Sequence, residues 1–387
     1  MLSGHNIICF SCDWRQDPLS KHHIMTRLAK TNRVLWINSI GMRKPTATVK
    51  DFSKIINKIK SISKGLQHID QGLYVYTPMV LPYNNILSGI LNNCLLKLQV
   101  KHLQNKLNLD NPILWSFLPN MVKLIGSFGE KTTIYYCTDD FTKFEGYSAH
   151  KLAKQEEEII SRSEISFFTA QSLLDNKAKK GRRSYLMRHG VDLEHFSKSW
   201  KEKQSTPSEL AGLKKPVIGF WGELNESVDY SLLKSLAFAK PDWSFVLIGG
   251  SNYAGSTRLP IIKNIGNIHM LGPKPYSKLP QYAASFDVAI LPKSKSELAL
   301  NMNPLKLREY LAAGVPVVST PLPEVLPYGD VVKFADNIQE YIWAIENILK
   351  IPKYEQAKAL SQRVKDESWD AKVEEISSII EQALKSK

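Results

Sequence analysis

Short apolar runs alternate with helical patterns along almost the whole chain, and this alternation limits the folds that the chain can adopt. In the first half, strand-like runs rich in β-branched and aromatic residues lie at 6–12, 33–39, 72–80, 112–119, 131–140 and 165–171. Helical segments separate many of these runs, at 20–31, 84–107 and 149–164. Strands that alternate with helices at this spacing predict a parallel, doubly wound α/β sheet.

The same alternation begins again after a polar stretch at 197–210. Strand-like runs follow at 215–224, 243–250, 267–273, 287–293 and 315–320, with helical segments among them at 229–241, 279–286 and 304–312. A chain of 387 residues is also longer than one ordinary domain. We therefore predict two α/β domains, at 1–200 and 213–365, and a last helix within 366–387 that crosses back to the first domain.

Positive charge is concentrated in one stretch of the first domain. The formal net charge of +14 favours an anionic partner, such as nucleic acid, a membrane surface or a phosphorylated substrate. Seven lysines and arginines lie within 43–64, with Asp51 as the single acidic residue among them. Within 52–62, a phenylalanine and four isoleucines share one face of a predicted helix, which is typical of a helix at a lipid headgroup boundary. The alternative is a surface helix packed on its own domain, with a solvated basic side.

The same stretch bears on nucleic-acid binding. Binding that tolerates any sequence needs aromatic side chains interleaved with the basic ones. Phe52 is the single aromatic residue within 43–64. This composition disfavours nucleic acid as the partner and favours an anionic membrane surface.

The cysteines and the apolar runs bear on the compartment in which the chain works. Cys9 and Cys12 form a lone C-x-x-C motif, without the second ligand pair or the following helix that metal or redox chemistry would need. Cysteine use of this kind is typical of a reducing cytoplasm. No run of the sequence approaches the ~18 apolar residues of a membrane span, and no basic region precedes the first apolar run. We expect a cytoplasmic protein.

The predicted helix at 304–312 has an unusual concentration of charge near its start. Pro304 suits a first helical position, and Gly314 suits the end of the helix. Lys306 and Arg308 place positive charge at the positive end of the helix dipole, a conflict that a phosphate ligand would remove. Glu309 can accept two hydrogen bonds from a sugar diol, so the pattern indicates a nucleoside diphosphate. The alternative is a capped amphipathic helix whose charges face solvent and need no ligand.

The position of this helix favours the ligand. In open parallel sheets, ligands bind beyond the carboxyl ends of the strands. In the second domain, four segments reach that edge, beginning at Gly219, at Ile248, at Leu291 and after Thr320. The third of these leads directly into the helix that begins at Pro304. We therefore expect a ligand site at the start of this helix.

Several longer stretches carry a family resemblance. In the second half they are IGFWGEL, PDWSFVLIGG, NIHMLGPKPYSKLPQYAASFDVAILP and NPLKLREYLAAGVPVVSTPLPEV. Together they make 216–324 resemble the donor domain of GT-B glycosyltransferases of the retaining, glycogen-synthase-like kind, above all bacterial polysaccharide and teichuronic-acid-type transferases. In the first half, CDWRQDPLSKHHIMTRLAKTNRVLWIN, IYYCTDDF and RHGVDLEHF follow the family in order. The resemblance omits about 44–110, and it implies two Rossmann-like doubly wound domains that face a cleft.

The resemblance implies a donor site in the second domain. The family pattern places two glutamates around the helix, of which the second falls on Glu309 and binds the nucleotide ribose. The first, which contacts the donor sugar in the family, falls on Asn301. The family also places basic residues after the first donor-domain strand, but Glu223 stands there, so we expect Lys306 to hold the diphosphate, with Lys293 or backbone N–H groups as alternatives. The predicted donor residues are Gly222, Glu223, Gly249, Lys293, Asn301, Asn303, Pro304, Leu305, Lys306 and Glu309.

The resemblance implies an acceptor site in the first domain. Asp139 and Asp140 end a strand where relatives carry a catalytic-region histidine. Because adjacent side chains diverge on a strand, we expect one of them to orient the acceptor hydroxyl or the donor sugar, and the alternative is an N-cap for the next helix. The turn after the first strand meets acceptor and diphosphate in the family, and His22 is a candidate general base there. The other predicted residues of this turn are Asp13, Trp14 and Lys21.

The sequence thus predicts a glycosyltransferase that needs a nucleotide-sugar donor but no metal or other cofactor. The resemblance implies transfer with retention to a glycan or to a polyprenyl-diphosphate-linked acceptor in bacterial surface polysaccharide biosynthesis. The basic first domain suits a peripheral position on the inner face of the cell membrane. Three alternatives remain open: a sugar-nucleotide epimerase or hydrolase, a non-catalytic partner subunit suggested by Asn301, and a nucleic-acid-binding protein.

Overall fold

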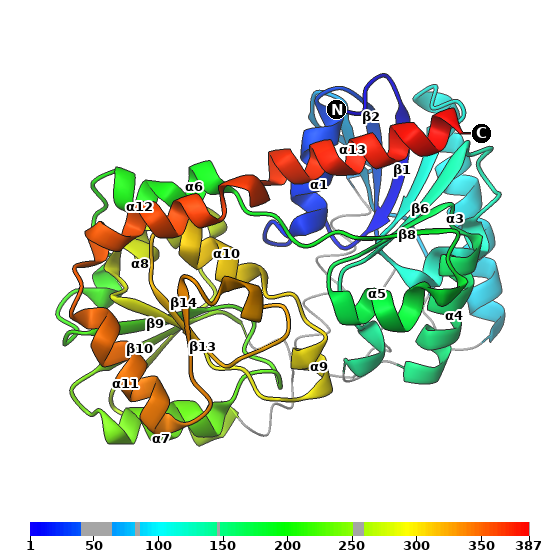
Figure 1. Ribbon diagram of the computed structural model, residues 1–387. Helices are drawn as coiled ribbons and strands as arrows, with labels where there is room; N and C mark the ends of the chain where they lie inside the picture. The colour runs from blue at the N-terminus through cyan, green and yellow to red at the C-terminus, as the bar shows by residue number, and fades with distance from the viewer. Residues whose placement is uncertain (40–63, 82–85, 145–147, 251–258, 387) are drawn as a thin grey trace. The chain divides into compact units, whose positions relative to one another are not determined.

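The structure is a computed structural model that describes residues 1–39, 64–81, 86–144, 148–250 and 259–386. The chain divides into two compact units (Figure 1). The first unit contains Met1–Arg188 and Lys372–Lys387, and the second contains His189–Ala371. The last helix, α13 (Trp369–Lys385), therefore begins in the second unit and ends in the first. The basic helix predicted within 52–62 lies outside the described residues.

Within the described residues, the first unit is built on an eight-stranded sheet in the order β3-β4-β2-β1-β5-β6-β7-β8. Its strands are β1 (Asn6–Ser11), β2 (Arg33–Asn38), β3 (Leu66–Asp70), β4 (Leu73–Tyr76), β5 (Ile113–Ser116), β6 (Thr132–Cys137), β7 (Ile165–Phe168) and β8 (Arg183–Leu186). Neighbouring strands run parallel, except that β3 is antiparallel to β4 at one edge. The predicted doubly wound sheet is confirmed, although β3 and β8 were not predicted and the antiparallel edge departs from a purely parallel sheet.

Helices pack against this sheet through two clusters of buried apolar side chains. The helices are α1 (Ser20–Ala29), α3 (Ile86–Lys106), α4 (Ala149–Arg162) and α5 (Gln171–Lys177), with 3-10 turns η1 (Pro119–Leu124) and η2 (Phe141–Lys143). One cluster joins α3, through Leu96 and Val100, to Ile8 of β1. The other joins α4, through Ile159, to Phe168 of β7. Each such buried side chain contributes roughly 1.5–3 kcal/mol, so the inner faces of α3 and α4 fix these helices to the sheet.

The second unit is built on a parallel sheet that, within the described residues, has six strands in the order β11-β10-β9-β12-β13-β14. Its strands are β9 (Val217–Trp221), β10 (Ser244–Ile248), β11 (Ile268–Gly272), β12 (Val288–Leu291), β13 (Val317–Ser319) and β14 (Val332–Phe334). Its helices are α6 (Leu193–Lys201), α7 (Tyr230–Ala239), α8 (Leu279–Ser285), α9 (Glu297–Leu300), α10 (Leu305–Ala312), α11 (Ile338–Leu349) and α12 (Lys353–Arg363). The chain leaves β9 toward β10 and later returns to the other side of β9 as β12, so the strand order reverses at β9. Ligands of such sheets bind at this reversal, beyond the carboxyl ends of the strands.

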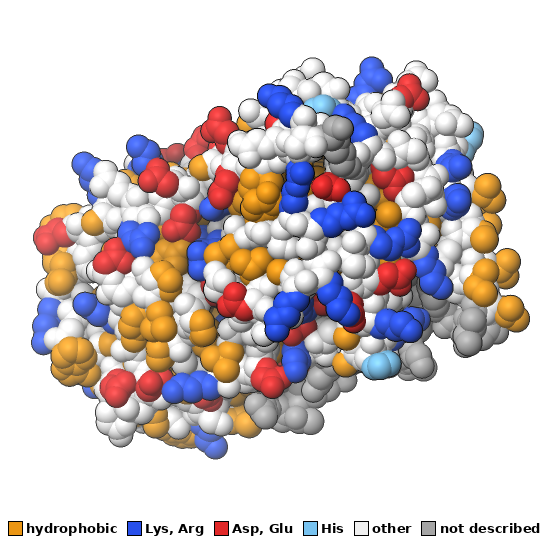
Figure 2. Space-filling model, turned by 45° about the vertical axis from the view of Figure 1, so that its right-hand side comes forward, with side chains coloured by type: hydrophobic (Ala, Val, Ile, Leu, Met, Phe, Trp, Pro, Cys, Tyr) orange, Lys and Arg blue, Asp and Glu red, His pale blue; other side chains and the backbone are white. Residues whose placement is uncertain are grey.

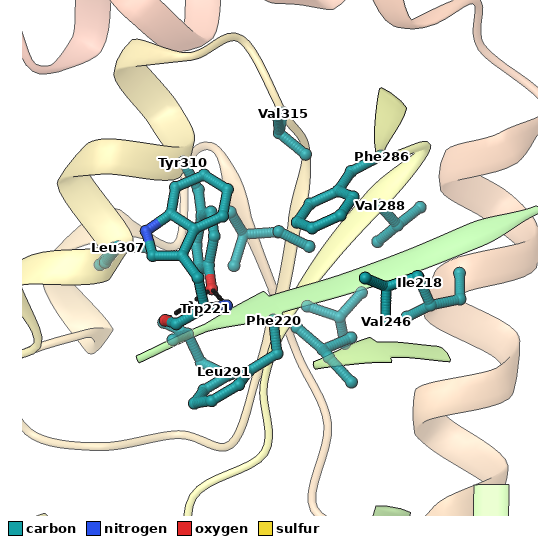
Figure 3. Close-up of a cluster of buried hydrophobic side chains, with 14 of the residues drawn as sticks. Ile218, Phe220, Trp221, Val246, Phe286, Val288, Leu291, Leu307, Tyr310 and Val315 are labelled. Carbon is teal, nitrogen blue, oxygen red and sulfur yellow. Dashed lines mark hydrogen bonds between the residues drawn. The ribbon is translucent and has the colours of Figure 1, made fainter. Parts of the chain in front are cut away.

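The core of the second unit packs closely around β9. Figure 3 shows Phe286 against this strand, with Ile218 and Val288 nearby. A Cβ atom at Gly219 would lie 1.9 Å from the ring of Phe286, so the ring requires a glycine beneath it. This packing fixes the strand whose carboxyl end carries Trp221.

The starts of two helices bear on the candidate sites. α1 begins at Ser20, and its cap position belongs to Leu19, whose N–H donates to Nδ1 of His22 at 3.1 Å. Pro304 was predicted at the first helical position of α10 but takes the cap position. The predicted end of that helix is confirmed, because Gly314 has a φ of +65° directly after the C-cap.

Candidate functional site

Trp221, the last residue of β9, joins that strand to α10. Its indole Nε1 donates to Oε2 of Glu309 at 2.7 Å, and its backbone N–H donates to the hydroxyl of Tyr310, also at 2.7 Å. The rings of Trp221 and Tyr310 meet edge to face, with centroids 4.1 Å apart (Figure 3). These contacts hold the middle of α10 at the carboxyl end of β9.

Glu309 is a buried carboxylate, with only 2% of its surface exposed. Nζ of Lys306 lies 3.0 Å from Oε2 of Glu309 and donates to Oε1 at 3.2 Å. A carboxylate has about four acceptor positions, so the indole and the ammonium group leave lone pairs available. The alternative prediction of an amphipathic helix with all its charges on the solvent face is therefore wrong for this glutamate.

Arg308 corrects a second expectation. Its side chain is fully buried, with Nε donating to Glu367 at 2.5 Å and Nη1 donating to the amide oxygen of Asn303 at 2.8 Å. Nδ2 of Asn303 donates in turn to Glu324 at 2.6 Å. Glu367 thus balances the charge of Arg308 within the protein, and this arginine needs no phosphate to relieve a conflict with the helix dipole. Whether Asn303 also contacts a ligand stays a prediction.

The first turn of α10 has the electrostatics of an anion site. Pro304 offers no side-chain cap, and the turn contains no acidic residue. The N–H groups of Leu305 and Lys306 precede the first intrahelical bonds, so they have no partner within the helix. Unpartnered N–H groups at the positive end of a helix dipole favour a negatively charged ligand.

Two glycine turns approach each other beside this helix. Gly222 follows β9 and Gly249 follows β10, both with a φ of +151°. A Cβ atom at Gly249 would lie 1.8 Å from the carbonyl oxygen of Gly222, so a side chain there would force the turns apart. Their own N–H groups donate to Ile248 and Gly272 respectively. These two backbone donors are therefore already used within the sheet.

Lys293 lies just beyond β12, near the reversal of strand order. The side chain is buried, and its Nζ donates to Oγ of Ser227 at 2.9 Å. Burial lowers the pKa of Lys293 to about 8, against the opposing effect of Glu223, which is exposed. Within the described part of the chain, no carboxylate forms an ion pair with Lys293, in contrast to Lys306. Lys293 is therefore a buried cation that an anionic ligand would stabilise.

Asn301, where the family pattern has a glutamate, ends the short helix α9. It is half-buried, and its backbone N–H donates to the carbonyl of Glu297 at 3.1 Å. It lies two residues before the Asn303 that pairs with Arg308. The structure thus places the amide of Asn301 in the turn that leads into α10.

In the first unit, the turn between β1 and α1 buries His22 among aromatic rings. The centroid of the His22 ring is 5.0 Å from those of Trp14 and of Trp36. Burial lowers the pKa of His22 to about 4, so the ring is neutral at physiological pH. Because Nδ1 accepts from Leu19, Nε2 carries the hydrogen, and within the described residues it has no hydrogen-bond partner. This arrangement suits a hydrogen-bond donor better than a base, and the catalytic role stays a prediction.

The other predicted residues of this turn, Asp13, Trp14 and Lys21, precede His22 in the sequence. The N–H of Trp14 donates to Oδ1 of Asn38 at 2.9 Å, and the carboxylate of Asp13 accepts from the N–H of Arg15 at 3.1 Å. Lys21 is buried at the second position of α1. At the start of this helix, the structure thus has a buried lysine and a buried imidazole N–H that has no partner among the described residues.

The two aspartates after β6 differ in their surroundings. Asp140 caps η2 through Thr142 and forms an ion pair with Lys177 at 3.0 Å. Burial opposes ionisation, but Lys177 and Thr142 lower the pKa of Asp140 below its usual value. The alternative prediction of an N-cap is confirmed for Asp140. Asp139 is half-buried, and its role at the acceptor stays a prediction.

Two further findings concern metals and membranes. Within the described residues, no group of three or more His, Cys, Asp or Glu side chains is arranged to hold a metal ion. Burial raises the pKa of both Cys9 and Cys12, which keeps the thiols protonated. In the described part of the chain, no helix combines the length and the apolar character needed to cross a bilayer.

Comparison with known proteins finds similarity to one family of enzymes. Residues 215–350 match the family model described as "Glycosyl transferases group 1". A protein of Bacillus subtilis (strain 168), named as a teichuronic acid biosynthesis glycosyltransferase, TuaH, is 26% identical over 367 residues, which cover 89% of this chain and 88% of TuaH. Over residues 215–350, the chain is therefore similar to group 1 glycosyltransferases.

Solved structures show the fold of the chain. The sucrose-phosphate synthase of Thermosynechococcus elongatus has a TM-score of 0.71 at 13% identity, over 99% of this chain and 100% of that one. HepE of Anabaena, solved in complex with UDP and glucose, has a TM-score of 0.67 at 13% identity, over 98% of this chain and 100% of its own. The predicted GT-B fold, with two Rossmann-like domains, is confirmed.

Trp221 and Tyr310 help to form the candidate site, and the sequence patterns did not point to either of them. Both lie inside motifs that carried the resemblance, yet each looked like an ordinary core aromatic. A polar aromatic at the very end of a strand was the available signal, because a buried indole N–H needs a partner. The partner, Glu309, is far away in sequence.

Proposed function

We propose that this chain is a group 1 glycosyltransferase that transfers a hexosyl group from a nucleoside-diphosphate sugar to a glycan or a lipid-linked acceptor in bacterial surface polysaccharide biosynthesis. The name of TuaH supports the pathway class, and HepE, solved with UDP and glucose, supports a uridine nucleotide as the first donor to test. The single observation that carries the proposal is the buried Glu309 of α10, which is held by Trp221 and Lys306.

The donor nucleotide binds at α10 in this proposal. The remaining lone pairs of Glu309 accept hydrogen bonds from the ribose hydroxyls. The diphosphate lies against the N–H groups of the first turn, with Lys306 and Lys293 as its cations. These N–H groups and ammonium groups are already in place where negative charge develops on the diphosphate. They therefore lower the barrier to its departure. The glycines at 222 and 249 keep the adjoining turns close together. Asn301 takes the position that contacts the donor sugar in the family pattern, so it bears on which sugar is accepted.

The acceptor binds to the first unit in this proposal. Nε2–H of His22 and the ammonium group of Lys21 are donors for an anionic or hydroxyl group, and Asp139 orients the acceptor hydroxyl. A double displacement with retention would need a carboxylate nucleophile, for which the sequence offers no clear candidate. We therefore favour attack on the face from which the diphosphate departs, with the acceptor proton passing to the departing phosphate oxygen. No metal or other cofactor takes part, and the protein works in the cytoplasm at the inner membrane face.

Thermal unfolding with nucleotides tests the donor site. The melting temperature is measured with UDP, GDP, CMP and ADP, for the wild type, for Glu309→Ala and for the control Glu355→Ala, which removes an exposed glutamate of α12. A ligand at 100 times its dissociation constant adds about 2.7 kcal/mol to the stability of the protein. We expect one nucleoside diphosphate to stabilise the wild type and the control but not Glu309→Ala. No stabilisation of the wild type by any nucleotide would refute the donor site.

A second candidate function rests on Asn301, because the family pattern has a carboxylate at the donor sugar there. A protein that binds the nucleotide without transferring sugar would act as a partner subunit. Release of UDP from UDP-glucose and other UDP-sugars, with bacterial membranes as the acceptor, distinguishes the two. Turnover supports the transferase, whereas nucleotide binding without turnover supports the partner subunit.

A further inference from the structure

The helix α3 of the first unit has two apolar faces. Leu96, Val100 and Leu103 form the inner face, which is buried in the core. On the outer face, large apolar side chains follow one another at helical spacing: Leu87, Ile90, Leu91, Leu95 and Leu98, all exposed. A helix that is apolar all round is usually covered on every side, by protein or by lipid. The outer face therefore needs an explanation that the fold of the unit does not supply.

The segment just before α3 extends this apolar surface. Met79 and Leu81 are exposed as well. Gln99 accepts from the N–H of Met79 at 2.9 Å and donates to its carbonyl at 2.8 Å. Asn92 accepts from the N–H of Leu81 at 2.7 Å and donates to its carbonyl at 2.9 Å. Two side-chain amides thus clamp this segment along α3, so that its apolar side chains add to a built surface.

The charges on the helix have one sign. α3 contains Lys97, Lys101 and Lys106 and no aspartate or glutamate. Lys97 and Lys101 are exposed beside the apolar stripe, and Lys101 continues the stripe toward the carboxyl end of the helix. Figure 2 shows hydrophobic side chains protruding along the right-hand edge of the view, with lysine and arginine side chains inward of them. An exposed apolar stripe of this extent marks an interaction surface, and its cationic border is complementary to an anionic one.

We propose that this surface, the α3 outer face, made of Met79, Leu81, Leu87, Ile90, Leu91, Leu95 and Leu98, binds to the surface of a lipid bilayer that contains anionic lipids. The leucines enter the boundary between headgroups and acyl chains, and the lysines reach the headgroup phosphates. The helix lies along the bilayer and does not cross it. The inference rests on the proposed function for its purpose, because it would hold the enzyme where a lipid-linked acceptor lies.

Vesicle flotation of the full chain tests the proposal. The vesicles contain phosphatidylcholine alone, or phosphatidylcholine and phosphatidylglycerol in equal parts, without nucleotide or acceptor. The test variant is Leu87→Gln with Leu98→Gln, which leaves every lysine in place. The control is Phe238→Gln with Trp343→Gln in the second unit, since these side chains are 65% and 68% exposed, against 69% and 66% for the two leucines. Thermal unfolding checks that all variants fold.

The expected result is specific to the outer face. The wild type and the control float with the phosphatidylglycerol vesicles, and the test variant partitions roughly tenfold more weakly or worse. Binding of the test variant equal to that of the wild type, or no vesicle binding by the wild type, would overturn the proposal. A dimer in light scattering that dissociates in the test variant would assign the face to a second copy of the chain instead. Each of these failures leaves the nucleotide site untouched, because nucleotide binding is measured separately.

Discussion

Replacing Trp221 with phenylalanine tests whether the indole N–H holds Glu309 in place. In the structure, Nε1 of Trp221 lies 2.7 Å from Oε2 of Glu309, and both side chains are buried. Phenylalanine keeps a ring against Tyr310 but has no N–H to donate. A hydrogen bond to a charged group contributes about 1.5–3 kcal/mol, so we expect Trp221→Phe to lower the free energy of unfolding of the second unit by about 2 kcal/mol.

Thermal unfolding of the full chain, followed by circular dichroism, measures this loss. For a unit of this size, each kcal/mol lowers the melting temperature by about 2–4 °C, so Trp221→Phe should lower it by about 4–8 °C. Trp243→Phe is the control, because Trp243 is buried in the same unit and its indole donates no hydrogen bond within the described residues. We expect the control to lose packing only, and to melt closer to the wild type.

A double-mutant cycle separates the hydrogen bond from the lost packing. It compares Trp221→Phe, Glu309→Ala and the variant that carries both substitutions. If the indole N–H holds the carboxylate, the two losses overlap, with a coupling energy of about 1.5–3 kcal/mol. Losses that add to within about 0.5 kcal/mol would refute the reasoning, because independent sites behave in that way.

Three further predictions concern the same unit. Gly249→Ala should lower the free energy of unfolding, measured with urea, by at least about 2 kcal/mol, because the new Cβ would lie 1.8 Å from a carbonyl oxygen. Gly250→Ala is the control; it has open space around it, so its free energy of unfolding should stay within about 0.5 kcal/mol of the wild type. Equal effects of the two substitutions would contradict the close approach of the two turns. Lys293 has a pKa lowered to about 8 by burial, so its positive charge is present below that pH and lost above it. The affinity for the nucleotide, measured by calorimetry, should therefore fall as the pH rises through about 8. Lys293→Met should bind the nucleotide more weakly, and its affinity should not show this fall with pH. A wild-type affinity that does not change across this range would count against Lys293 as a diphosphate ligand. Glu367→Gln should lower the stability of the protein by about 3–5 kcal/mol, because it leaves Arg308 buried without its carboxylate partner. Thermal unfolding measures this loss, and a melting temperature close to that of the wild type would show that the ion pair is dispensable.

The fold class followed from the sequence because the central strands are apolar and are separated by clear helical patterns. The strands that were missed lack that signal. β3 has exposed and half-buried residues and pairs at an edge, β8 is half-buried throughout, and β14 has three residues with a lysine at the centre. Edge strands need few apolar residues, so composition alone does not distinguish them from loops.

The candidate site was predictable as a place but not as a set of contacts. The charges at the start of α10 and its position after a strand indicated a ligand. The partner of Arg308 is Glu367, which lies on another element far along the chain, so the sequence showed a charged arginine where the structure has a buried ion pair. Glu309 likewise receives its hydrogen bond from Trp221, and this pairing depends on how α10 packs against β9. Contacts of this kind follow from tertiary packing, which local patterns do not encode.

A crystal structure of the chain with bound UDP tests the central claim most directly. The account predicts that the ribose hydroxyls lie within hydrogen-bond distance of Glu309 and that the diphosphate lies against the first turn of α10, near Lys306. A nucleotide bound elsewhere, with Glu309 contacting nothing but Trp221 and Lys306, would contradict it.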